Sequence, residues 1–221
     1  MKPLGLLISF GLIASTGRIV DFDTAPLGKM PPGWTAAMTN GGAAPQWEIV
    51  RDGSAPTQPY VFAQVSSDPR GNRFPLAIFD GLSVRDSDIS VRMKPVSGRA
   101  EQAGGLVFRY RDNNNYYLAR ANAMDGSVVL FKVQDGRRTP LCPGVHHDIP
   151  LNAWSILKVS VRGSRFQVYV NHRRILQGFD DTFSTTGKIG LWTVGDSVTY
   201  FDDLSVTPLS PTGAAPPSPT R

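Results

Sequence analysis

The stretch Gly104-Gly-Leu-Val-Phe-Arg-Tyr-Arg-Asp112 is followed, after two asparagines, by Asn115-Tyr-Tyr-Leu-Ala-Arg-Ala-Asn122. Each segment is an apolar run of the length of a β-strand. The polar residues 112–115 between them cap their own backbone and tolerate left-handed conformations, as a tight turn requires. The two segments therefore predict a β-hairpin.

Similar runs recur along the rest of the chain. They cover residues 47–50, 60–64, 74–79, 88–95, 127–134, 154–161, 165–171, 187–193 and 198–207. Turn signals such as Asp52-Gly53, Asp125-Gly126 and Asp135-Gly136 separate them, and no segment shows a convincing helical stripe. The pattern predicts an all-β protein, an antiparallel jelly-roll sandwich of two sheets.

The composition agrees with this class. Of 221 residues, 41% are hydrophobic and 19% charged, and the 22 glycines and 18 prolines disfavour a helix-rich protein. A single cysteine, Cys142, excludes a disulfide framework. The net charge of +5 is scattered along the chain, whereas nucleic-acid binders concentrate basic residues on one face. We therefore expect no nucleic-acid partner.

The two ends of the chain differ from its middle. Residues 1–17 combine a basic start, an apolar run and small residues, which predicts a secretory signal peptide. The run is too short to span a bilayer comfortably, so we expect no stable membrane anchor after cleavage. The proline-rich residues 208–221 predict a disordered tail. One domain, residues 18–207, of a secreted or periplasmic protein is expected.

Four segments carry a family resemblance: residues 104–112 and 115–122, Trp154-Ser-Ile-Leu-Lys-Val159, and the long run from Gly190 to Val206. Here the chain resembles the concanavalin A-like lectin/glucanase superfamily, in particular bacterial exported domains related to laminin-G-like and 3-keto-disaccharide hydrolase domains. The resemblance implies a concanavalin A-like jelly roll with a concave and a convex sheet. It implies a non-catalytic carbohydrate-binding module first, with a hydrolase of the 3-keto-disaccharide type or a laminin-G-like adhesion domain as alternatives.

The acidic residues bear on whether the protein is an enzyme. Glycosidases need two carboxyl groups flanking the scissile bond, and glucanases of this superfamily carry Glu-x-Asp-x-Glu on one strand. The chain has only two glutamates, Glu48 and Glu101, and lacks that motif. Asp86 and Asp88 lie in a turn-like segment. Catalytic residues are therefore not assigned, and a glycoside hydrolase stays an alternative, with a carboxylate beside Arg109 or Arg120 as the first suspect.

Sugars are bound by aromatic faces and by directional hydrogen bonds from polar side chains. The candidate residues for binding a poly- or oligosaccharide on the concave sheet are Arg109, Arg120, Asn122, Tyr117 and Trp192, with Arg92 and Lys132 further out. Trp192 and Tyr117 equally suit the core between the sheets.

Strand alternation sorts these residues between the two faces of a sheet. It places Tyr110 with Leu106 and Phe108. It also places Arg120 with Leu118. Arginine and lysine are expected within the apolar runs of three neighbouring strands.

The resemblance also implies a structural calcium ion where the first and last strands meet. Phe201-Asp-Asp-Leu-Ser-Val206 resembles the terminal motif, so Asp202 is the expected C-terminal ligand, and Asp21 and Asp23 are expected from the N-terminal side. Carboxylate oxygens are suitable ligands for this hard cation. Paired aspartates at a strand edge also cap turns or discourage edge pairing, which is the alternative.

Overall fold

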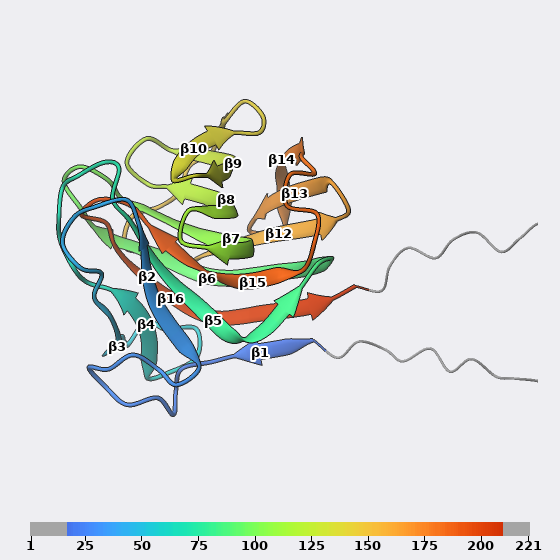
Figure 1. Cartoon of the computed structure of the whole chain (residues 1–221). Coiled ribbons are helices and arrows are strands. Elements are labelled where there is room, and N and C mark those ends of the chain that lie inside the picture. Colours follow the sequence, from blue (N-terminus) through green and yellow to red (C-terminus); the bar gives the residue numbers. More distant parts are fainter. Residues whose placement is uncertain (1–16, 210–221) are drawn as a thin grey trace, which may run out of the picture.

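The computed structural model describes residues 17–209, which form two antiparallel β-sheets packed face to face (Figure 1). Sheet A has the strand order β14-β13-β12-β6-β16-β4-β3, with β1 beside β16. Sheet B has the order β10-β9-β8-β7-β15-β5-β2, with β11 beside β9. Residues 17–209 contain no helix. The predicted jelly-roll sandwich is confirmed.

The strands are β1 (Arg18–Val20), β2 (Trp34–Thr39), β3 (Trp47–Arg51), β4 (Tyr60–Gln64), β5 (Phe74–Val84), β6 (Ser87–Ser97), β7 (Ala103–Asp112), β8 (Asn115–Asn122), β9 (Ser127–Gln134), β10 (Arg137–Pro140), β11 (Val145–His146), β12 (Ser155–Arg162), β13 (Arg165–Val170), β14 (Arg173–Phe179), β15 (Gly187–Thr193) and β16 (Val198–Pro208). Every run predicted to be a strand is one. The sequence patterns missed β1, β2, β10, β11 and β14.

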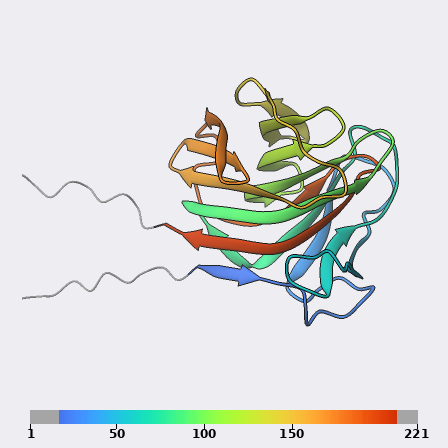
Figure 2. The ribbon, with the colours of Figure 1, turned by 180° about the vertical axis from the view of Figure 1, so that it is seen from behind.

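The first and last described strands lie side by side (Figures 1 and 2). β1 pairs antiparallel with β16, with Arg18 opposite Val206. β16 also extends to Pro208, one residue past the predicted end of the domain, because Pro208 lies opposite Ser87 and the amide of Leu209 donates to the carbonyl of Asp86. The signal peptide predicted for residues 1–17 and the tail predicted for residues 208–221 otherwise lie outside the described residues.

The main core fills the space between the sheets. Every second residue of the central strands points into it, including Phe62, Val91, Phe108, Leu191 and Phe201, all at most 1% exposed. Complete burial of one such side chain contributes about 1.5–3 kcal/mol. The alternating strands predicted from sequence therefore stabilise the sandwich through one face each.

Sheet B is strongly curved. Neighbouring strands lie about 4.8 Å apart, so a flat sheet would separate β10 from β15, four positions along, by about 19 Å. The guanidinium carbon of Arg138 on β10 nevertheless lies 5.6 Å from the centre of the Trp192 ring on β15. At the sheet margins, the side-chain amide of Asn40, which follows β2, donates to the carbonyl of Gly136 between β9 and β10 (3.3 Å). The face of sheet B turned away from the core is therefore concave.

The concave face has an apolar cluster of its own, separate from the main core. It contains Phe74, Leu76, Ile78, Ala103, Val107, Tyr116, Leu118, Val129, Phe131, Val133, Trp192 and Val194. Trp192 is fully buried there, because the curved sheet folds its own margins over the centre. This cluster forms an apolar floor beneath the polar side chains of the concave face.

Candidate functional site

Four polar side chains meet on the concave face of sheet B, and we call them the polar cluster. Arg120 and Asn122 project from β8, Arg138 from β10, and Glu101 from the loop before β7. Arg120 lies on the same face as Leu118, as the alternation predicted, and Asn122, two residues further along β8, lies on that face as well. The pairing of strands β10-β9-β8-β7 brings these four residues together, although they are spread over residues 101–138 of the sequence.

Arg138 lies against three aromatic rings. Its guanidinium carbon is 4.7 Å from the centre of the Phe131 ring, 4.9 Å from that of Phe74 and 5.6 Å from that of Trp192. Its Nη1 is buried and has no hydrogen-bond partner. Burial lowers the pKa of Arg138, and the positive charge of Arg120 lowers this pKa further. A desolvated cation with an unused N–H donor is costly to keep, unless a ligand supplies an acceptor.

Arg120 is 7% exposed and lies above the same Phe131 ring, 5.6 Å from its centre. Its Nη2 donates to the hydroxyl of Ser127 and lies 3.5 Å from a carboxylate oxygen of Asp125. Its Nε is buried and has no hydrogen-bond partner. Like Arg138, Arg120 therefore keeps a donor that the fold does not use.

Glu101 supplies the acceptor of the cluster. Its Oε2 accepts a hydrogen bond from Nδ2 of Asn122 at 2.9 Å, and Oδ1 of Asn122 accepts one from the amide of Met124. None of the ion pairs within 4.0 Å among residues 17–209 joins Glu101 to Arg138. Its charge nevertheless acts to raise the pKa of Arg138. Glu101 is therefore hydrogen-bonded to Asn122 but is not paired with either arginine of the cluster.

The two aromatic residues among the candidates, Trp192 and Tyr117, are fully buried. Trp192 forms part of the buried floor beneath Arg138. Tyr117 points into the core between the sheets, where its hydroxyl donates to Asp180 and accepts from the amide of Phe183 at 3.0 Å. Tyr117 therefore takes the core position that the sequence left open, whereas Trp192 lies on the predicted concave face but is covered there.

Arg109 lies away from the polar cluster. It has a left-handed backbone conformation (φ 47°) at a shift in the β7–β8 register, is 2% exposed and stacks on Phe166. Its guanidinium donates to Asp86 (3.2 Å) and to the carbonyls of Arg85 (3.2 Å), Phe183 (3.0 Å) and Gly163 (2.6 Å). Every nitrogen is used within the fold, so Arg109 and its carboxylate Asp86 hold loops together.

The same irregularity corrects the expected position of Tyr110. Alternation placed it with Phe108 in the core, but it packs on the concave face, with its ring centre 6.2 Å from that of Tyr116. A left-handed residue interrupts the alternation of a strand, and nothing in the sequence marks Arg109 as that residue.

The outlying basic residues also do not form one surface. Lys132 pairs with Asp180 at 3.0 Å. Arg92 lies on sheet A, since β6 belongs to that sheet, and pairs with Asp203 at 3.1 Å. The expectation that Arg92 lies on the concave sheet was therefore wrong.

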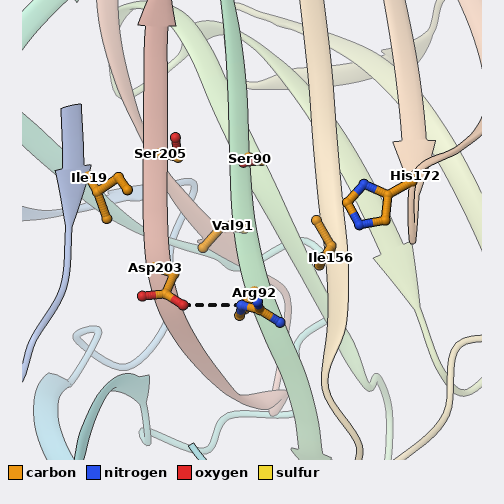
Figure 3. Close-up of a pocket in the computed structure, with 8 residues that line it drawn as sticks. All are labelled: Ile19, Ser90, Val91, Arg92, Ile156, His172, Asp203 and Ser205. Atoms are coloured by element: carbon orange, nitrogen blue, oxygen red, sulfur yellow. Dashed lines mark hydrogen bonds and ion pairs between the residues drawn. The ribbon is translucent and has the colours of Figure 1, made fainter. Parts of the chain in front are cut away.

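Arg92 lines a separate groove of about 290 Å³ on the outer face of sheet A (Figure 3). Ile19 lies on one side of it and Ile156 and His172 on the other, with Ser90 and Ser205 between them. The close-up shows the Arg92–Asp203 pair within this groove. No phenylalanine, tyrosine or tryptophan lines it, and it lies on the sheet that does not carry the polar cluster.

The sequence patterns missed Arg138 because they missed its strand. The segment Arg137-Arg-Thr-Pro140 has no apolar alternation and ends in proline. Such a composition is typical of an edge strand, which β10 is. The adjacent hairpin signal Asp135-Gly136 was the only indication that a strand continued beyond it.

The predicted calcium ligands are only partly brought together. Asp202 is fully buried, and its carboxylate accepts hydrogen bonds from the amide (3.1 Å) and hydroxyl (3.0 Å) of Thr57. Burial, assisted by the charge of Asp203, raises the pKa of Asp202 to about 6. Asp23 accepts from the amide of Tyr60 (3.5 Å), and Asp21 is exposed. Within residues 17–209, no three acidic, histidine or cysteine side chains are grouped to hold a metal. The calcium site stays a prediction.

Comparisons with known proteins identify the architecture. A carbohydrate-binding module, CBM66, from Bacillus subtilis superposes with a TM-score of 0.62 at 22% identity, over 83% of this chain and 98% of that one. Domain 4 of AbnA, a GH43 extracellular arabinanase from Geobacillus stearothermophilus, solved with arabinotriose, superposes with a TM-score of 0.54 at 16% identity, over 88% and 92%. The protein has a concanavalin A-like fold. The jelly-roll fold that the resemblance implied is confirmed.

A curated relative adds a sequence match to the concanavalin A-like fold. Levanase from Bacillus subtilis is 31% identical over 121 residues, which are 54% of this chain and 17% of that enzyme. The chain thus matches a small part of a much longer protein. No protein-family model matches the sequence. Among residues 17–209, no helix has the length and apolar character needed to cross a membrane.

Proposed function

We propose that the protein is a non-catalytic carbohydrate-binding module and that the polar cluster binds the saccharide. The observation that carries the proposal is the pair of arginines with unused, buried N–H donors beside a carboxylate acceptor. A sugar hydroxyl can accept from a guanidinium and donate to a carboxylate at the same time. The similarity to CBM66 and to the arabinanase domain supports the proposal through the shared fold.

The charges of the site favour a neutral saccharide. Arg120 and Arg138 carry two positive charges, and Glu101 and Asp125 carry two negative ones. An added carboxylate or sulfate would gain attraction from the arginines but would meet Glu101, and like charges at short range are costly. Levan, arabinan and xylan are therefore the first polysaccharides to test, levan because of the levanase relative.

We also place the protein outside the cytoplasm. The proposal rests on the signal peptide predicted for residues 1–17 and on a structural neighbour described as extracellular. Expression with the native N-terminus followed by N-terminal sequencing of exported protein tests it. A cut near residue 17 is expected, and retention of the uncut chain in the cytoplasm would contradict it.

Isothermal titration calorimetry of the purified protein against these polysaccharides tests binding. Saturable binding to at least one neutral polysaccharide, reduced in Arg138→Ala, is expected. Reducing-sugar release is measured on the same samples, because a glycoside hydrolase is the alternative. Absence of binding to the whole panel would overturn the proposal, and turnover that requires Glu101 would replace it with the hydrolase.

A further inference from the structure

Asp196 is a buried carboxylate outside the polar cluster. It lies in the turn between β15 and β16 and is 6% exposed. Its oxygens accept hydrogen bonds from three successive backbone amides, those of Arg99 (2.7 Å), Ala100 (3.1 Å) and Glu101 (3.1 Å). Consecutive amides directed at one anion form a strong binding concavity for it. The carboxylate therefore fixes the backbone of residues 99–101.

The segment held by Asp196 has little freedom. Gly98 has φ 149°, and a Cβ atom at this position would lie 1.8 Å from the carbonyl oxygen of Glu101. The side-chain amide of Gln102 donates back to the carbonyl of Gly98 at 3.0 Å. The chain thus folds back on itself immediately before β7, and only glycine fits at the closest approach.

Glu101 is the last residue of this segment. Its amide binds Asp196, and its side chain accepts from Asn122 at 2.9 Å. We infer that Asp196 is a positioning residue for saccharide binding, acting through Glu101. The inference rests on the proposed function, because it gives Asp196 a role only if Glu101 contacts the ligand.

The carboxylate of Asp196 is charged at neutral pH. Burial alone would raise the pKa of Asp196, but the hydrogen bonds from the three amides outweigh burial and lower it. Substitution by asparagine removes the charge and turns one acceptor into a donor that faces N–H groups. Asp196→Asn should therefore release Glu101 while leaving the arginines and their aromatic floor in place.

A double-mutant cycle in saccharide affinity tests the inference. Asp196→Asn is expected to weaken binding about fivefold in the wild-type background and hardly at all in Glu101→Gln, because the two residues act in series. Asp196→Glu, which retains the carboxylate, should restore part of the affinity. Asp68→Asn is the matched control, since Asp68 also binds loop amides (Ala43 and Arg70) but none of residues 99–101. Equal losses from Asp196→Asn in both backgrounds would overturn the inference.

A second measurement needs no ligand. The side-chain amide signals of Asn122 in a ¹H–¹⁵N spectrum report its hydrogen bond to Glu101, and they should shift in Asp196→Asn but not in Asp68→Asn. Unchanged Asn122 signals would overturn the positioning role whether or not the protein binds saccharide. A shift together with absence of binding by the wild type would contradict the proposed function alone.

Discussion

The guanidinium of Arg138 lies 4.7 Å from the centre of the Phe131 ring, and the same ring lies beneath Arg120 at 5.6 Å. Cation–ring contacts of this kind contribute from about 0.5 to 2 kcal/mol each, more when desolvated. One phenylalanine therefore holds two arginines at fixed positions on the concave face. The surface that we propose binds the saccharide is made of guanidinium groups supported by aromatic rings, and the rings themselves are buried.

The first prediction concerns Arg138. Arg138→Ala should weaken saccharide binding at least tenfold, because a hydrogen bond to a charged group contributes about 1.5–3 kcal/mol. Titration calorimetry gives the Kd. Arg137→Ala is the control, because the preceding residue of β10 is exposed and points to the opposite side of the strand. Equal losses in the two variants would argue for a general charge effect and against the site.

The second prediction concerns the acceptor. Glu101→Gln retains the shape of the side chain but loses its charge, so saccharide affinity should fall about tenfold. Glu48→Gln changes the only other glutamate of the chain, which lies on β3 of sheet A, and should leave the Kd unchanged. A Kd for Glu101→Gln within twofold of wild type would remove Glu101 from the site.

The third prediction separates stability from binding. Arg109→Ala removes the charged partner of Asp86 and the donor of three carbonyl groups, which should cost about 3–5 kcal/mol in the free energy of unfolding. Urea denaturation measures this loss, and the Kd of the folded variant should not change. Arg111→Ala, two residues along and exposed, should stay within about 0.5 kcal/mol of wild type. A folded, stable Arg109→Ala variant that no longer binds saccharide would contradict this assignment.

The fourth prediction concerns acid stability. Burial acts to raise the pKa of Asp180, but hydrogen bonds from Tyr117, Thr182 and Lys132 outweigh it and lower this pKa to about 2, against 3.8 for an ordinary aspartate. The folded state therefore gains stability, about 2 kcal/mol, that is full above pH 3.8 and is lost as the pH falls through about 2.

Denaturation of Asp180→Asn at several pH values tests this contribution. The variant should be less stable than wild type at pH 7, and the difference should shrink below pH 3.8. The neighbouring exposed Asp181→Asn is the control. A difference that is independent of pH would show that the charge of Asp180 is not the cause.

The fifth prediction concerns calcium. If Asp202 ligates the ion, calcium at about 100 times its Kd should stabilise the protein by about 2.7 kcal/mol and raise its melting temperature by several degrees. Thermal unfolding with calcium and with a chelator measures this shift, which should vanish in Asp202→Asn. An unchanged melting temperature on chelation would remove the calcium site.

Local sequence patterns were sufficient to predict the strands in which apolar and polar residues alternate strongly. The hairpin of β7 and β8 and the long C-terminal strand β16 follow from runs of alternating or continuous apolar residues between turn signals. Short or polar strands, such as β10 and β14, carry no such pattern. Both lie at the edge of a sheet, where a strand pairs with one neighbour only and its side chains are more exposed. The position of Arg138 was consequently not foreseen.

Side-chain direction was foreseen only where the backbone stays regular. Arg120 and Asn122 lie on the expected face because β8 alternates without interruption. In β7, the left-handed backbone conformation of Arg109 directs its side chain toward three carbonyl groups and places Tyr110 on the other face of the sheet. A one-residue irregularity reverses every later assignment in a strand.

The sequence by itself determined the fold class, most of the strands and two residues of the polar cluster, because strand periodicity and turn chemistry are local properties. The tertiary structure decided that Arg138 and Glu101 join Arg120 and Asn122, and that Arg109 does not. The physical reason is the curvature of sheet B, which brings an edge strand over the rings of strands distant from it in the sheet. Curvature results from the twist between each pair of neighbouring strands and from the contact of Asn40 with Gly136 across the two edges of the sheet. No single segment of the sequence encodes it.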